Sequence, residues 1–173
     1  MNNPNDKKDT ESCCCNCDYT LAFFMLRGWL AMRAIYAGIE KYGAYKSIQK
    51  SLGDGTDAVV DLKVKYYSFD NYHGIPATLR TKFENEALLP GFSLNIFDKC
   101  LGPALIITGL MLLIGLGTRT SLVLQGIIYI ALSVGLILIN QPDGIAYLGI
   151  HLGLVAGALI LAKHNKLALL KKW

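Results

Sequence analysis

Residues 121–140 read SLVLQGIIYIALSVGLILIN and contain no charged side chain. A helix needs about 20 predominantly apolar residues to cross the hydrocarbon core of a bilayer. This stretch therefore predicts a membrane-spanning helix and an integral membrane protein.

Three further apolar runs lie on either side of this stretch. Residues 145–162 contain only His151 as a titratable group, and residues 101–117 are apolar and rich in glycine. Residues 19–39 are also apolar, but they include two arginines. We therefore expect an all-α membrane protein, a bundle of four transmembrane helices at about 19–43, 99–117, 121–140 and 144–163.

The rest of the chain consists of a leading segment and an insertion. Residues 1–18 are polar and rich in cysteine, and they precede a single membrane domain over residues 19–173. Residues 44–97, between the first and second helices, mix charges, tyrosines and turn-forming residues. This insertion is too polar to lie in lipid, so it is expected to be extramembrane.

Two elements are predicted within the insertion. Apolar and polar residues alternate over residues 60–66, which favours a strand, although an amphipathic helix is the alternative. Pro76 can open a helix over about residues 77–88, because proline is tolerated in a first turn.

The basic residues indicate how the bundle is oriented. Arg119 lies in the link between the second and third helices, Lys7 and Lys8 precede the first helix, and four lysines follow the last. Four spans place all of these on one side, so both termini are expected in the cytoplasm. The net charge of +4 is modest, and we expect membrane lipid rather than nucleic acid as a partner.

Arg27 is predicted to be a structural polar group in the core of the bundle. An arginine near the centre of a membrane helix costs about 2.5 kcal/mol or more, so it usually faces protein or a watery cavity. Arg27, Gly38 and Lys41 fall on one helical face with two alanines, and small residues allow a second helix to approach closely. Gln125 and Tyr129 of the third helix are the expected partners of Arg27. The alternative is that Arg27 extends to the membrane surface.

A polar group is also predicted near the outer ends of the first and last helices. Arg33 and His151 lie at similar depth, with Tyr147 one turn above His151. Their donors suit the carbonyl groups of a quinone, which makes this group a possible quinone pocket. The alternative for His151 is a structural hydrogen bond between helices. A haem is less suited, because only one histidine is placed deep enough.

Two patterns of small residues complete the candidate sites. Gly149, Gly153 and Gly157 repeat every four residues, which predicts a stripe for close helix packing. Cys14 and Cys17 form a C-x-x-C spacing that is a weak candidate for redox chemistry or a soft metal, the alternative being inert thiols.

Two motifs resemble the DoxX-like family of membrane proteins. One is the series Arg27, Gly38 and Lys41; the other is the run GLMLLIGLGTR at residues 109–119, which is similar to the family's G-x-x-L-x-x-G-L-x-T-R stretch. The resemblance implies a four-helix membrane fold in a bacterial or archaeal cytoplasmic membrane. It also implies small DoxX- or DoxD-type subunits of quinone-linked oxidoreductases, and it implies that Arg27 and Lys41 form a structural polar core.

Three functions are weighed on this basis. The first is an accessory membrane subunit of a quinone-linked respiratory oxidoreductase complex, which binds other membrane subunits rather than catalysing. The second is a quinone-binding oxidoreductase subunit of the thiosulfate:quinone type. The third is a small transporter or lipid-interacting membrane protein.

Overall fold

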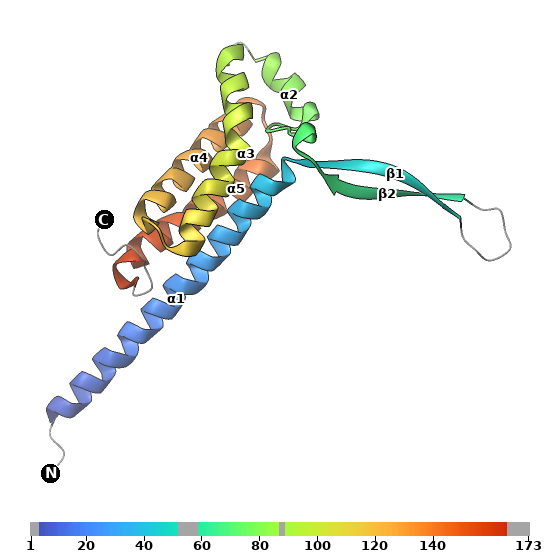
Figure 1. The fold of residues 1–173 in the computed structure, drawn as a ribbon. Coiled ribbons are helices and arrows are strands. Elements are labelled where there is room, and N and C mark those ends of the chain that lie inside the picture. Colours follow the sequence, from blue (N-terminus) through green and yellow to red (C-terminus); the bar gives the residue numbers. More distant parts are fainter. Residues whose placement is uncertain (1–3, 52–58, 87–88, 166–173) are drawn as a thin grey trace.

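The computed structural model describes residues 4–51, 59–86 and 89–165, and the side chains of residues 18–50, 60–86 and 89–165. Four long helices form a bundle (Figure 1): α1 (Pro4–Glu40), α3 (Gly91–Ile114), α4 (Thr118–Leu138) and α5 (Pro142–Leu161). Between α1 and α3 lie β1 (Gly43–Ser51), β2 (Val59–Tyr67), the short 3₁₀ helix η1 (Phe69–Asn71) and α2 (Ala77–Glu84). A second 3₁₀ turn, η2 (Ala162–His164), follows α5.

Three of the described helices are long and apolar enough to cross a membrane: α3, α4, and α5 with its extension to His164. Only 33% of the α3 window and 17% of the α5 window are buried within the chain, so most of their apolar side chains face outward. Such an exterior suits lipid, and three such helices indicate a multi-pass membrane protein. The expected fourth span, in α1, does not reach the same apolarity, because Arg27 and Arg33 interrupt it.

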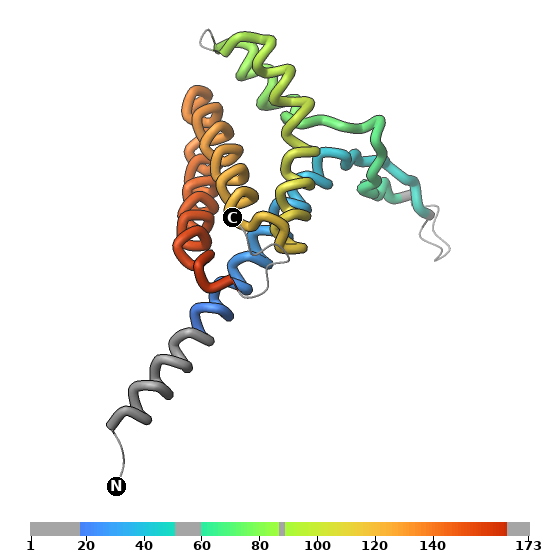
Figure 2. Tube along the Cα trace, turned by 60° about the vertical axis from the view of Figure 1, so that its left-hand side comes forward, coloured from blue at the N-terminus to red at the C-terminus, as the bar shows by residue number. Residues whose placement is uncertain are grey.

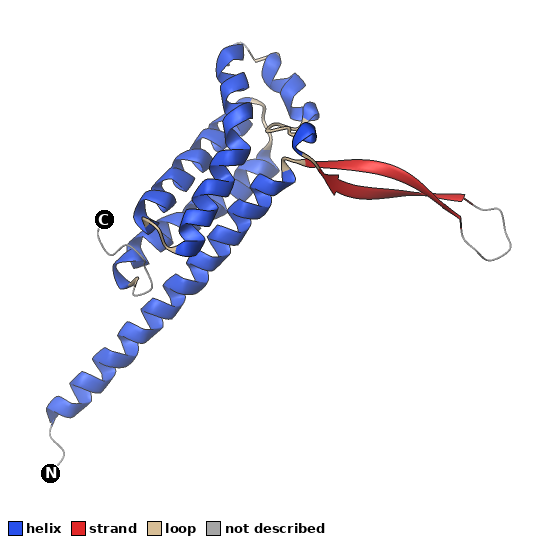
Figure 3. Ribbon diagram, viewed as in Figure 1, coloured by secondary structure: helices blue, strands red, loops and turns tan. Residues whose placement is uncertain are grey.

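The expectation of an all-α fold needs correction, because the insertion contains a β-ribbon (Figure 3). Strands β1 and β2 pair antiparallel from Gly43 opposite Tyr67 to Ser51 opposite Val59. The ribbon leaves the end of α1 and projects away from the helices (Figure 1). The alternation over residues 60–66 was therefore that of a strand, and the helix expected from Pro76 is α2.

The contact between α1 and α3 depends on small residues. Ala31 and Ala34 are fully buried in it. A Cβ atom added at Gly38 would lie 3.0 Å from the carbonyl oxygen of Gly102, and one at Gly109 would lie 3.0 Å from that of Ala31. The two helices therefore approach each other closely through the face predicted to pack inward.

Helix α3 is bent at Pro103, and Figure 2 shows its first half leaning away from α4 and α5. Proline has no N–H group to donate to the Lys99 carbonyl four residues back. The hydroxyl group of Tyr72, from the insertion, lies at this gap. Its oxygen is 2.5 Å from the Asp98 carbonyl oxygen and 3.0 Å from that of Lys99, and it accepts from the Gly102 N–H at 3.2 Å. A side chain from outside the helix thus replaces its interrupted hydrogen bonds.

Helix α2 is fastened to the bent half of α3 through Asp98. One carboxylate oxygen of Asp98 accepts from the Ile75 N–H at 2.6 Å, and the other accepts from the Arg80 guanidinium at 3.1 Å. Arg80 also donates to Asn95 at 2.9 Å. These bonds hold α2 as a cap over one end of the bundle.

Candidate functional site

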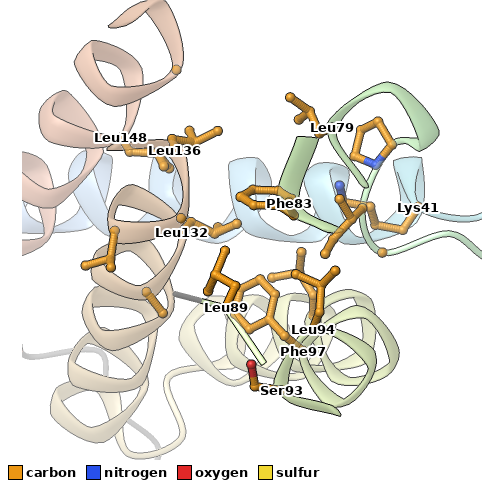
Figure 4. A pocket seen from close by; sticks show the side chains of 18 of the residues that line it. Lys41, Leu79, Phe83, Leu89, Ser93, Leu94, Phe97, Leu132, Leu136 and Leu148 are labelled. Carbon is orange, nitrogen blue, oxygen red and sulfur yellow. The ribbon is translucent and has the colours of Figure 1, made fainter. Parts of the chain in front are cut away.

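An apolar cavity of about 460 Å³ lies beneath α2, between the first half of α3 and the helices α4 and α5. Small-molecule sites span about 300–1,000 Å³ and are lined mainly by apolar side chains. In Figure 4, Lys41 and Leu79 lie on one side of the cavity and Leu132, Leu136 and Leu148 on the other. Phe83, Leu89, Leu94 and Phe97 line the cavity between these two sides.

The cavity exists because two local features hold the helices apart. The bend at Pro103 leans α3 away from α4 at this end of the bundle (Figure 2). Phe83 of α2 reaches across and packs against Gly135 of α4, where a Cβ atom would lie 3.3 Å from its ring. The cap therefore covers part of the cavity without filling it.

Lys41 is the only charged residue among the described residues that line the cavity. It follows the last residue of α1, and its carbonyl oxygen accepts from the His73 N–H at 2.8 Å, which fixes the backbone there. Its side chain is half-buried, and this burial lowers the pKa of the Lys41 ammonium from its ordinary value, because burial disfavours the charged form. A polar group at the edge of an apolar cavity is a typical ligand-orienting arrangement.

The predicted quinone-pocket residues are only partly brought together. Tyr147 lines the cavity, but Arg33 and His151 are absent from its described lining. His151 uses Nδ1 to contact the carbonyl oxygen of Tyr147 at 2.8 Å, within its own helix. Its ring meets Tyr129 edge-on at 5.7 Å between centroids. No hydrogen bond or ion pair among the described residues joins Arg33 to Tyr129 or His151.

Arg27 is buried, with 5% of its surface exposed, at the end of the bundle opposite to the cavity. Its guanidinium donates to the carbonyl oxygens of Leu112 at 2.7 Å and Leu113 at 2.9 Å, in the last turn of α3. It also reaches Asn165, which donates to Thr118 at the start of α4. Arg27 thus satisfies carbonyl groups that a helix end leaves without partners.

The expected partners of Arg27 on α4 have other contacts. Gln125 is fully buried and donates to the carbonyl oxygen of Leu30, one turn further along α1. Tyr129 lies beside His151. Gln125 and Tyr129 were expected to pair with Arg27 because they lie at a similar depth in the membrane. The pairing also depends on the direction of each side chain, which is set by the rotation of each helix about its axis.

The glycine stripe predicted on α5 is not used for close packing within the described chain. A Cβ atom at Gly149 or Gly153 would meet nothing within 4 Å, and one at Gly157 would lie 3.8 Å from Leu26. Close helix contact is made instead by Gly38, as predicted from α1, against α3. Cys14 and Cys17 lie outside the residues whose side chains are described.

The cavity itself was not predicted from the sequence. Most of its lining consists of apolar residues, chiefly leucines, that look like ordinary membrane-helix residues. Pro103 was the available signal, because a proline inside an apolar helix commonly bends it.

No family model, curated protein or solved structure matches this chain. The DoxX-like resemblance therefore stays a prediction that rests on residues 27–41 and 109–119.

Proposed function

We propose that this protein is a small multi-pass membrane protein that binds one lipid-like molecule in the cavity beneath α2. The observation that carries the proposal is the apolar cavity. Its volume lies in the range of small-molecule sites, and Lys41 is the only cationic side chain in its described lining. It lies among helices whose outer faces suit lipid, so an apolar chain could enter from the bilayer.

We also propose that α1 crosses the membrane as a fourth span, with both termini in the cytoplasm. Tyr19 stacks on His164 at 5.1 Å, so the start of the apolar part of α1 lies beside the end of α5. Gly38, near the other end of α1, packs on Gly102 of α3. Helix α1 therefore follows the bundle from one end to the other. Its hydrogen bonds to carbonyl oxygens of α3 offset much of the cost of placing Arg27 in a membrane.

The lipid-binding proposal is tested by filling the cavity. Leu132→Trp places an indole among the lining side chains, whereas Leu124→Trp makes the same change on the exposed side of the same helix. The full chain in lipid nanodiscs is titrated with a long-chain fatty alcohol labelled for detection. We expect Leu132→Trp to weaken binding by about tenfold or more, which is about 1.4 kcal/mol, and Leu124→Trp to leave it unchanged. Equal binding by both variants and the native chain would exclude the cavity as the site.

A second candidate function, an accessory subunit of a quinone-linked respiratory complex, is favoured by the ribbon. Residues directly opposite each other in the register share a face, and one face combines two lysines, Lys46 and Lys50, with a group of exposed apolar side chains: Ile48, Val60, Leu62, Val64 and Tyr66. A two-stranded ribbon is marginally stable alone, so burying this face on a partner subunit would stabilise it.

The accessory-subunit proposal is tested by co-purification from the native membrane in mild detergent. Ile48→Thr with Leu62→Thr removes an opposed pair from the apolar face. Gln49→Thr with Asp61→Thr is the matched pair on the other face. We expect only the first to reduce recovery of a partner. A native chain that purifies alone and monodisperse contradicts this role and leaves the lipid-binding proposal untouched.

A further inference from the structure

Lys41 faces an apolar cavity without a partner of its own. None of the hydrogen bonds or ion pairs found among the described residues involves its ammonium group, although the side chain is half-buried. Burying an ammonium group without acceptors costs free energy unless a counter-charge is supplied. A ligand in the cavity is one source of that counter-charge.

The nearby carboxylates are already engaged by other donors. Glu40 and Asp98 both act electrostatically on Lys41. Glu40 accepts from Lys65 at 2.8 Å, and this contact fastens the ribbon to the end of α1. Asp98 accepts from Ile75 and Arg80, and these contacts fasten the cap to α3. Neither carboxylate turns to Lys41, so its ammonium remains available to an acceptor inside the cavity.

The size of the cavity restricts what can accompany that acceptor. At about 460 Å³ it lies in the lower part of the usual range for ligand sites, and one hydrocarbon chain suits it. The described lining beyond Lys41 offers mainly leucine and phenylalanine side chains. A neutral quinone head would leave the charge on Lys41 uncompensated.

We infer that the ligand of this cavity is an anionic single-chain lipid, in its simplest form a long-chain fatty acid, whose head group binds Lys41 while its chain lies between α3 and α4. This inference rests on the proposed lipid-binding function and adds the charge of the ligand to it. A carboxylate and a phosphate monoester share the chemistry that Lys41 recognises, which is a charge-assisted hydrogen bond from an ammonium group.

The test compares ligands that share a chain and differ in the head group. Palmitate and the fatty alcohol of the same chain length are titrated against the full protein in nanodiscs. The proteins are the native chain, Lys41→Met, Lys41→Arg and, as a control, Lys46→Met on the exposed ribbon. We expect Lys41→Met to weaken palmitate binding by about tenfold or more and to weaken binding of the alcohol by much less, because the alcohol loses a hydrogen bond but no ion pair. Lys41→Arg should retain palmitate binding, and Lys46→Met should behave as the native chain.

The pH dependence gives a second readout. Because burial lowers the pKa of Lys41 below the ordinary 10.5, the ammonium loses its proton at a lower pH than an exposed lysine does. Palmitate binding should therefore fall as the pH rises toward 10.5, and it should be independent of pH over that interval in Lys41→Met. Binding of the alcohol should not follow this change in either protein.

The outcomes separate the two proposals. If the alcohol binds but Lys41→Met binds palmitate as tightly as the native chain does, the anionic ligand is wrong and the lipid-binding function stands. If neither palmitate nor the alcohol binds the native chain, both proposals fail. Lysophosphatidic acid of the same chain length identifies the head group: tighter binding than palmitate, lost in Lys41→Met, assigns a phosphate head to the same site.

Discussion

At the scale of single residues, buried polar side chains bond to backbone groups that helices leave free. Arg27 donates hydrogen bonds to carbonyl oxygens in the last turn of α3, and Gln125 donates one to the carbonyl oxygen of Leu30. Such bonds matter in a membrane, because lipid offers no hydrogen bonds to an unpaired group. They connect helices that are distant in sequence.

Removing Arg27 should therefore destabilise the bundle more than removing its neighbour Arg33. Arg27→Leu leaves the Leu112 and Leu113 carbonyl oxygens without this donor, which we expect to lower the free energy of unfolding by about 1–3 kcal/mol. Arg33→Leu is the matched control, because Arg33 makes no hydrogen bond or ion pair among the described residues. Thermal unfolding in detergent measures both variants. Equal or higher stability in Arg27→Leu would mean that the arginine is held no more firmly than a surface side chain.

The burial of Arg27 could be expected from sequence, but its partners could not. An arginine that shares one face of an apolar helix with Gly38 is enough to indicate that this face packs inward. The pairing with α3 rather than with α4 depends on the rotation of each helix, which no single-sequence pattern specifies. For the same reason Tyr129 was assigned to Arg27 although it lies against His151.

At the scale of elements, hydrogen bonds between the insertion and α3 stabilise the conformation of both. Tyr72 supplies a hydroxyl group at the interruption caused by Pro103, and Asp98 of α3 holds the loop before α2. The strand and the short helix were predictable, because alternation and a leading proline are local signals. Their attachment to α3 was not, because it joins residues about 25 positions apart through side chains.

Tyr72→Phe should destabilise the bend in α3. The change leaves the Gly102 N–H without its acceptor and the Asp98 carbonyl without a donor, at an expected cost of about 1–3 kcal/mol. Tyr42→Phe is the control, because the Tyr42 ring contacts Tyr72 at 4.9 Å but its hydroxyl makes no hydrogen bond among the described residues. The measurement is the shift of the unfolding midpoint in detergent for each variant. Identical midpoints would show that the hydroxyl group does not support the bend.

At the scale of the whole molecule, the apolar exterior and the path of α1 determine the topology. The exterior of α3, α4 and α5 was predictable from the length of the apolar runs. The proposed passage of α1 across the membrane is less evident from the sequence, because its two arginines lower its apolarity below that of the other three helices.

Single cysteines test the path of α1 in a background without native cysteines. If α1 spans, Asp18→Cys and Lys163→Cys lie on the same side of the membrane, and Ser47→Cys on the ribbon lies on the other. An impermeant thiol reagent applied to intact cells should then label only Ser47→Cys. Labelling of Asp18→Cys together with Ser47→Cys would instead place both ends of α1 outside and leave three spans.

The central claim, that a lipid chain occupies the cavity beneath α2, is tested most directly by photolabelling. The full native chain in nanodiscs is irradiated with a fatty alcohol that carries a photoactivatable group at the end of its chain, and the labelled residues are located by mass spectrometry. We predict saturable labelling within residues 91–101 and 131–136, which an excess of unlabelled alcohol prevents and Leu132→Trp abolishes. Labelling that is confined to outward residues such as Ile127 and Ile150, and that does not saturate, would contradict the claim.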